Sequence, residues 1–441
     1  MGRGSGCIRT AAFATGAAPQ YNRRALFWPA SSIGPSQIEG EPSVADEFYF
    51  NPFDPAFRAN PYPFYKPLYA GPPRLIDFYG PTLLVARHAD VAAVWCDPER
   101  FSSEPPTAGS RPSDRSMFGG PVILLLDPPA HTRLRRLVSH LFTPRKVREG
   151  LAAAVDSITR RLLDHAAEKG EFDAVTELAD PLPTMVIAHV LGFPIEDHRI
   201  LKEWSDLLLD GLNTPPDQGF PPSYHKALDE RDSYLSDIME KRRSKPQDDL
   251  ISMLLAAQEE GDKLSTKEVI GFINLLLLAG NETTTNLISS ALLHVIRHPG
   301  QHQLLRDNPQ MAAAAIEEVL RYDCPVQALG RTARVDMVFA DTRVPANTRI
   351  YVLAGASGRD PAKFRNPDTF DITRESNEHL AFGLGIHFCL GASLARLEGT
   401  TALRMSVERF PHLQMANPDA ALGYKGSFET RGLRELKLVA A

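Results

Sequence analysis

One cysteine near the end of the chain lies where it could serve as a metal ligand. Cys389 is part of the stretch FGLGIHFCLG (residues 382–391), which contains three glycines. Glycine permits backbone conformations and close approaches that a Cβ would prevent, and a helical pattern begins directly after this stretch. Free N–H groups and the dipole at a helix N-terminus favour a thiolate over a thiol. The position therefore suits a metal-binding thiolate, although a buried core residue is the commoner role of such a cysteine.

A second polar motif interrupts a long apolar run. The segment LLLLAGNETTTNLISSALL, which starts at Leu275, contains Ala279, Gly280, Glu282 and Thr283. Residues 279 and 283 are one helical turn apart and share a face. A threonine hydroxyl bonded to the carbonyl four residues earlier loosens a helix locally, and a nearby carboxylate can relay protons. The alternative is an ordinary buried helix with a polar patch.

Charged residues stand at helical spacing in two other segments. Glu318 and Arg321 in AAAAIEEVLRYDCPV are at i and i+3, and His131 and Arg135 in DPPAHTRLRRLV are at i and i+4. Both spacings bring the two side chains together on one helix face. On a protein surface such pairs contribute only about 0.5 kcal/mol and would indicate no function.

Taken together, these segments resemble the cytochrome P450 superfamily. FGLGIHFCLG fills every fixed position of the haem-binding signature Phe-Gly-x-Gly-x-His/Arg-x-Cys-x-Gly. AGNETT resembles the motif of the family's long central helix, and Glu318-x-x-Arg321 resembles its ExxR pair. KFRNPDTFDITR (residues 363–374) matches a further family spacing, FxxPxxFxxxR. The resemblance covers about residues 50 to 438 and is greatest to the soluble bacterial class.

The resemblance implies a b-type haem, iron protoporphyrin IX, with Cys389 as the axial thiolate ligand. A thiolate ligand pushes electron density toward the iron and favours O–O cleavage. Cationic or titratable side chains at matching positions are expected to bind the haem propionates: His131, Arg135, Arg331 and His387. The other haem-binding residues implied by the signature are Phe382, Gly383 and Gly391.

The resemblance also assigns catalytic and structural roles. Ala279 and Gly280 would leave room for dioxygen beside the haem, and Thr283 and Glu282 would deliver protons. In the family the ExxR pair is buried and braces the loop before the haem cysteine. Glu318 and Arg321 are therefore expected to be structural residues.

The elements that must position these residues are mainly helical. Periodicity predicts helices over 130–141, 144–167, 181–192, 196–212, 223–243, 248–259, 266–298, 300–307, 309–322 and about 390–410. Two short strands and a helix are expected in 74–95, a long loop at 102–121, and a strand pair at 333–339 and 344–353. We predict a mainly α protein with small β-sheets, the cytochrome P450 fold, in a single large domain over 46–441. Residues 1–45 are interpreted as a disordered or targeting-like tail.

Composition restricts the partners and the location. With a net charge of −6, the chain has no global basic field for nucleic acid. No apolar run approaches the ~18 residues of a membrane span, so we expect no membrane anchor. Four scattered cysteines favour a reducing compartment. The cytoplasm is therefore predicted, or an organelle if the tail, which has four arginines and no acid before Glu39, is a transit peptide.

The function predicted from the resemblance is a haem-thiolate monooxygenase. It would hydroxylate or epoxidise a small hydrophobic substrate with dioxygen and with electrons from NAD(P)H, delivered by a separate ferredoxin or flavodoxin and its reductase. A basic segment at residues 133–148 would suit docking of such an acidic partner. The residues expected near the substrate are Phe118, Leu212, Leu276, Val326, Leu329 and Phe428. The alternatives are a peroxide-driven peroxygenase, a class that generally lacks the acid–threonine pair, and a haem-binding sensor or carrier without turnover.

Overall fold

The computed structural model describes residues 48, 50–78, 80–106, 116–212, 219–256, 264–425 and 428–440, without the side chains of 210–212. The predicted tail over 1–45 lies outside these ranges, as do residues 107–115 of the predicted loop and the side chain of Leu212. Residues Phe48–Ala441 form one compact unit. Within the described ranges, no helix carries an apolar stretch long enough to cross a bilayer.

Helices make up most of this unit, and they lie where the periodicity predicts them. The longer ones are α3 (His88–Trp95), α4 (Ala130–Val138), α5 (Pro144–Lys169), α6 (Pro181–Leu191), α7 (His198–Leu212), α8 (Pro222–Ser244), α9 (Leu250–Ala256), α10 (Thr266–Arg297), α11 (Pro299–Asp307), α12 (Ala312–Tyr322) and α14 (Ala392–Arg409). The short α1 (Pro55–Ala59), α2 (Tyr62–Tyr65) and α13 (Ala354–Ser357) were not predicted, because a single turn shows no periodicity.

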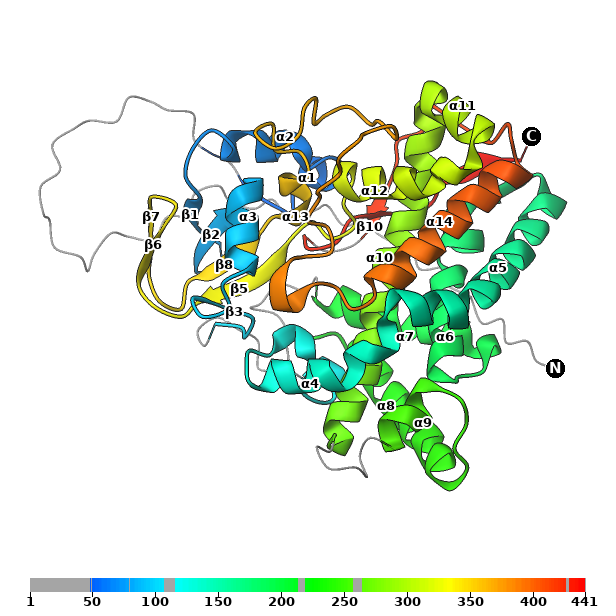
Figure 1. The fold of residues 1–441 in the computed structure, drawn as a ribbon, viewed down its shortest axis with the longest axis horizontal. Coiled ribbons are helices and arrows are strands. Elements are labelled where there is room, and N and C mark those ends of the chain that lie inside the picture. Colours follow the sequence, from blue (N-terminus) through cyan, green and yellow to red (C-terminus); the bar gives the residue numbers. More distant parts are fainter. Residues whose placement is uncertain are drawn as a thin grey trace, which may run out of the picture. The chain divides into compact units, whose positions relative to one another are not determined.

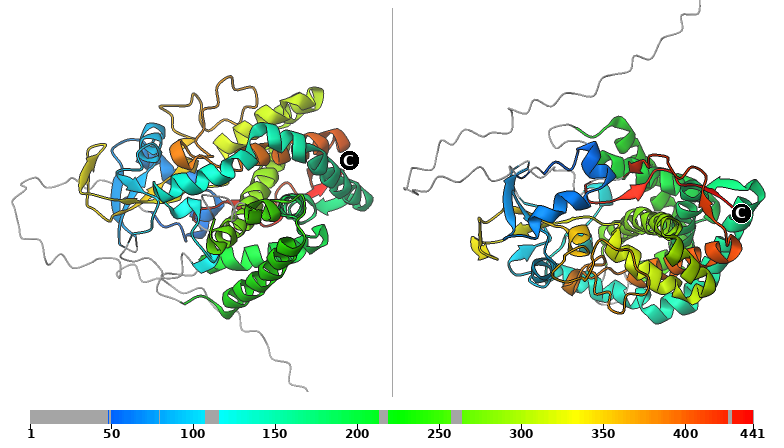
Figure 2. Two further views of the ribbon diagram at one scale, coloured as in Figure 1. Left: turned by 60° about the horizontal axis from the view of Figure 1, so that its bottom comes forward. Right: turned by 90° about the horizontal axis from the view of Figure 1, so that it is seen from above.

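The longest helix, α10, organises the others. It starts with a capping box, in which the side chains of Ser265 and Glu268 bond each other's backbone N–H. It packs against α6, α7, α12 and α14, and α14 also lies along α5. In Figure 2, α10 runs through the middle of the helices. Residues of α10 are therefore positioned by contacts on several sides.

The strands form one larger sheet beside the helices (Figure 1) and three small ones. The larger sheet has the order β1-β2-β8-β5-β3 and consists of β1 (Arg74–Asp77), β2 (Pro81–Val85), β8 (Arg349–Val352), β5 (Leu329–Ala333) and β3 (Phe101–Ser102). Among the described strands of this sheet, β2 and β8 pair in parallel and the other neighbours are antiparallel. The small sheets pair β10 (Tyr424–Lys425) with β11 (Gly432–Leu433), β6 (Met337–Phe339) with β7 (Thr342–Val344), and β12 (Lys437–Val439) with both β4 (Glu171–Asp173) and β9 (Gln414–Met415).

The strand pair predicted over 333–339 and 344–353 is in fact two pairs. β6 and β7 form a hairpin whose two-residue turn, Ala340 and Asp341, has positive φ at both positions, as the tightest hairpin turns require. β8 instead pairs with β5, after a turn in which Asn347 is also left-handed. The first predicted range contains the end of β5 together with β6, and the second contains the end of β7 together with β8. The fold class itself is confirmed as mainly α with small sheets in one large domain.

Candidate active site

The loop before α14 is shaped around Cys389. The Cys389 N–H donates to the Phe382 carbonyl at 2.8 Å, which closes the loop. Gly383 and Gly385 both have left-handed φ, at 73° and 70°. A Cβ at Gly385 would also lie 2.7 Å from the carbonyl oxygen of Trp95 in α3. Glycine is therefore required at these two signature positions by conformation and, at Gly385, by close packing.

The Cys389 thiol has accessible surface, although dense protein surrounds it. Burial is the largest influence and raises the pKa of the thiol, whereas the N–H groups of Gly391 and Ala392 and the charges of Arg135 and Arg396 lower it. An accessible thiol with N–H donors and cationic side chains near it suits a thiolate that binds a cation. Arg135 also donates to the Phe388 carbonyl at 2.6 Å, so it contacts the cysteine loop directly.

One face of α10 is accessible while the rest of the helix in this region is buried. Ala279 is exposed, and Leu276, Gly280 and Thr283 are half-buried. These positions follow the i, i+3, i+4, i+7 pattern of a single helix face. The Thr283 hydroxyl donates to the Ala279 carbonyl at 2.7 Å, as expected, although α10 continues as a helix through this point. The structure thus places the small residues and the predicted proton donor on one accessible face.

Glu282 lies on a different face of α10 and is buried. Its Oε1 accepts a hydrogen bond from the Thr430 hydroxyl at 3.0 Å. Burial raises the pKa of the Glu282 carboxyl; the bond from Thr430 and the charges of Lys425 and Lys202 lower it, and Asp206 raises it. Glu282 is thus a buried carboxyl next to Thr283 in sequence, surrounded by groups that can exchange protons.

The predicted propionate ligands lie close together, with His131 and Arg331 buried and Arg135 and His387 half-buried. The rings of His131 and His387 are 4.2 Å apart between centroids, and His387 Nε2 is 2.9 Å from the Ser103 hydroxyl. Burial and the neighbouring Arg331 and His131 lower the pKa of His387 to about 3, and burial lowers the pKa of Arg331 to about 10. The lowered pKa values of His387 and Arg331 indicate that the cluster disfavours additional positive charge.

Few acids balance this cluster. Its neighbouring carboxylate, Asp127, already accepts bonds from Arg334, Ser102 and the Ser103 N–H. Among the described residues, neither ring nitrogen of the buried His131 has a hydrogen-bond partner. Arg331 is 7% exposed and bonds only the carbonyl of Gly330 within this part of the chain. Orphaned buried donors need acceptors, so the cluster fits a group that carries carboxylates.

The ExxR residues, Glu318 and Arg321, form a buried hydrogen-bonded pair. Arg321 is completely buried and donates to both oxygens of Glu318, at 2.8 and 2.7 Å. It also donates to the carbonyls of Gly358, Pro367 and Thr369 at 2.8 to 2.9 Å. Glu318 in addition accepts from Arg374, at 3.2 Å. The pair therefore ties α12 to the segment that leads to the cysteine loop.

Sequence reasoning missed the neighbouring Glu317. It accepts from Arg396 of α14 at 2.7 and 2.9 Å and is 3.0 Å from His379 Nε2. Arg396 also lies over the Phe382 ring, at 4.4 Å from its centroid. These bonds lower the pKa of Glu317 to about 2. The available signal was the pair of adjacent acids, Glu317 and Glu318, in AAAAIEEVLR. Adjacent residues of a helix point in different directions, so two neighbouring carboxylates indicate two different partners.

The predicted substrate residues are not all placed together. Leu276 is on the accessible face of α10, and the buried Phe118 belongs to the apolar cluster that packs along α10. Leu329 and Val326 are half-buried in and before β5, and Val326 forms a backbone bridge with Thr430. Phe428 instead packs edge-on against Phe50 and Tyr351 in a separate aromatic cluster. Leu212 ends α7, and its side chain is outside the described ranges.

A sequence profile of the cytochrome P450 family matches residues 73–420. The chain belongs to the cytochrome P450 family. Cytochrome P450 CYP107DY1 of Priestia megaterium is 38% identical over 382 residues, which cover 83% of this chain and 92% of the relative. The structure of CYP109E1 from Bacillus megaterium with testosterone superposes with a TM-score of 0.80 at 35% identity, over 87% of this P450 and 99% of that chain. The myxobacterial CYP267B1 with myristic acid gives 0.83 at 34% identity, over 88% and 98%.

This P450 is an oxidoreductase of the monooxygenase class, and its family implies a haem. The residues present fit that group, because the N–H groups of Gly391 and Ala392 favour a thiolate at the accessible Cys389, and the nearby His131 is buried without a partner among the described residues.

Proposed function

We propose that Cys389 binds the iron of a b-type haem and that this P450 inserts oxygen into a small hydrophobic substrate. When bound, the haem supplies the activation of dioxygen. One oxygen atom enters the substrate and the other leaves as water, which consumes a pair of electrons and a pair of protons. The observation that carries the proposal is the accessible face of α10, where the Thr283 hydroxyl lies beside the small Ala279 and Gly280, with the buried Glu282 behind it.

The roles of the other residues follow from their surroundings. His131, Arg331 and His387 would hold the propionates, because the buried His131 has no partner among the described residues and the buried Arg331 donates there only to the Gly330 carbonyl. Arg135 would orient the cysteine loop through its bond to the Phe388 carbonyl. Thr283 would hold a proton at the haem side of α10, and Glu282 would replace it. Phe382, Gly383 and Gly391 would shape the loop around the thiolate.

The electrons would come from NAD(P)H through a separate ferredoxin or flavodoxin. Support comes from the exposed basic side chains of α4 and the start of α5, which are Arg136, Arg145, Lys146 and Arg148. Arg145 forms an ion pair with Glu149 at 2.9 Å, which reduces the net positive charge of this surface. A substrate of low polarity is supported by the solved complexes of relatives with testosterone and with myristic acid, and by the apolar residues Leu276 and Phe118 along α10.

The test is turnover of the purified holoprotein with a surrogate ferredoxin system, NADPH and steroid or fatty-acid candidates. Thr283→Val keeps the β-branched shape and removes the donor, so product formation should fall by about 10²-fold while NADPH is consumed and hydrogen peroxide appears. Thr283→Ser, which keeps the hydroxyl, should remain coupled. An unchanged product yield per NADPH in Thr283→Val would contradict the proposed role. Faster turnover with hydrogen peroxide than with NADPH would instead favour a peroxygenase.

A further inference from the structure

The partner that holds Glu282 comes from the C-terminal end of the chain. Thr430, between β10 and β11, donates its hydroxyl to Glu282 Oε1 at 3.0 Å. Its backbone bridges to Val326. The next residue, Arg431, donates to Asp323 at 3.0 Å and to the carbonyls of Arg58 and Ala59 at the end of α1. The Thr430 hydroxyl is thus held in place by neighbouring structure rather than by Glu282 alone.

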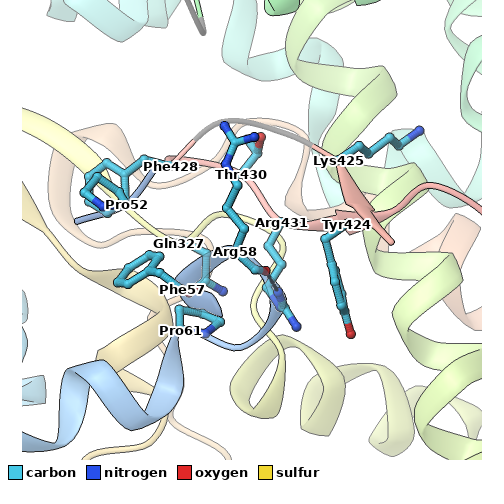
Figure 3. Close-up of a pocket in the computed structure, with 10 residues that line it drawn as sticks. All are labelled: Pro52, Phe57, Arg58, Pro61, Gln327, Tyr424, Lys425, Phe428, Thr430 and Arg431. Carbon is cyan, nitrogen blue, oxygen red and sulfur yellow. Dashed lines mark hydrogen bonds between the residues drawn. The ribbon is translucent and has the colours of Figure 1, made fainter. Parts of the chain in front are cut away.

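Thr430 also lines a pocket between α1 and the C-terminal segment (Figure 3). The pocket has an empty volume of about 330 Å³, counted with its opening to solvent. The enclosed part of this space is large enough to admit water. Polar groups of Arg58, Lys425 and Arg431 share its wall with apolar side chains such as Phe428. Thr430 therefore contacts the buried carboxyl through its hydroxyl and is also one of the residues that line a space open to water.

A second observation points to water in this region. Asn286 lies one turn after Glu282 on α10 and is completely buried. Within the described part of the chain, neither atom of its side-chain amide has a hydrogen-bond partner. Gly432 of β11 lies directly against it, since a Cβ there would come 1.7 Å from Asn286 Oδ1. A buried amide without protein partners is a place where ordered water binds.

The charges around Glu282 come from several elements. Lys202 and Asp206 of α7 and Lys425 of β10 act on it, and Asp180, before α6, is 3.2 Å from Lys425. Lys202 bonds Asp206 and is 3.7 Å from Asp180. Lys202 and Asp206 therefore offer a different path to Glu282, on the α7 side, whereas Lys425 also lines the pocket of Figure 3.

We propose that Thr430 is a positioning residue that holds the Glu282 carboxyl toward the pocket of Figure 3, and that water in this pocket supplies the protons that Glu282 passes on. The inference rests on the proposed role of Glu282 as the proton relay to Thr283. It adds the source of the protons and the residue that keeps the relay connected to this source.

The experiment follows the Glu282 carboxyl directly by infrared difference spectroscopy during pH titration, with Glu282→Gln to assign the band. Thr430→Val removes the donor to the carboxylate, so the midpoint of the Glu282 titration should rise by about one to two pH units. This is the size expected for losing one hydrogen bond to a charged group. Thr430→Ser should stay close to the unchanged protein. An unchanged midpoint in Thr430→Val would overturn the positioning role, whether or not the enzyme turns over.

The pocket is tested by the rate at which the same band exchanges in D₂O. Arg58→Trp places a larger apolar side chain in the pocket and should slow this exchange several-fold, whereas Asp206→Asn on the α7 side should leave it unchanged. If Asp206→Asn slowed the exchange and Arg58→Trp did not, the water source would lie on the α7 side and the proposal would be overturned. Both readouts are made on haem-loaded and haem-free protein without turnover, so they remain decisive even if the proposed function fails in the NADPH assay.

Discussion

Arg321 offers a quantitative test of how the fold supports the cysteine loop. Its buried guanidinium makes five hydrogen bonds, two to Glu318 and three to the carbonyls of Gly358, Pro367 and Thr369. A lysine keeps the charge but has one nitrogen with three donors, so Arg321→Lys loses at least two of these five bonds. At about 1.5–3 kcal/mol for each bond to a charged group, the free energy of unfolding should fall by about 3–6 kcal/mol.

The assay is equilibrium denaturation of the haem-free and haem-loaded protein, followed by circular dichroism. Arg404→Lys is the matched control, because Arg404 is 29% exposed and pairs only with partly exposed acids, Glu408 at 3.0 Å and Asp156 at 3.9 Å, among the described residues. It should change the free energy of unfolding by less than about 0.5 kcal/mol. A loss below about 1 kcal/mol in Arg321→Lys would refute the reasoning that the five bonds act as a buried brace.

Two further variants test buried charges. Arg331→Met should speed haem loss by roughly 10- to 100-fold, measured by transfer to apomyoglobin, because the proposed charged hydrogen bond to a propionate would be lost. The same variant should stabilise the haem-free protein. If Arg331 were purely structural, its replacement would lower both the haem affinity and the stability of the haem-free protein. Glu398 in α14 is buried without a partner for Oε2 among the described residues, and burial raises its pKa from 4.5 to about 8. The folded state therefore keeps a proton that the unfolded state releases, so the residue destabilises the fold increasingly from pH 4.5 to about 8. Glu398→Gln should match the unchanged protein in Tm near pH 4.5 and exceed it at pH 8; an equal difference at both values would contradict this assignment.

The parts of the site that could be predicted are those in which one local segment determines the chemistry. The signature around Cys389 is readable because Gly383 and Gly385 must adopt left-handed φ. The Thr283 bond to Ala279 follows from helical spacing alone. The helices were predictable for the same reason, since their apolar periodicity is long enough to measure.

The remaining contacts join residues that are far apart in the chain. No local pattern shows that Thr430 reaches Glu282, that His131 packs on His387, or that Glu317 holds Arg396. Short strands such as β4 and β12 are set by their partners rather than by their own sequence. The placement of Phe428 in an aromatic cluster depends on residues of the N-terminal part, such as Phe50, which family analogy did not consider.

The most direct test of the central claim is the carbon monoxide difference spectrum of the reduced protein. If Cys389 is the thiolate ligand, the unchanged protein should show the red-shifted Soret band of a thiolate-bound haem. Cys96→Ala, which removes an exposed thiol at the end of α3, should keep this band. Cys389→Ala should lose it, and a thiolate-type band that survives in Cys389→Ala would contradict the account.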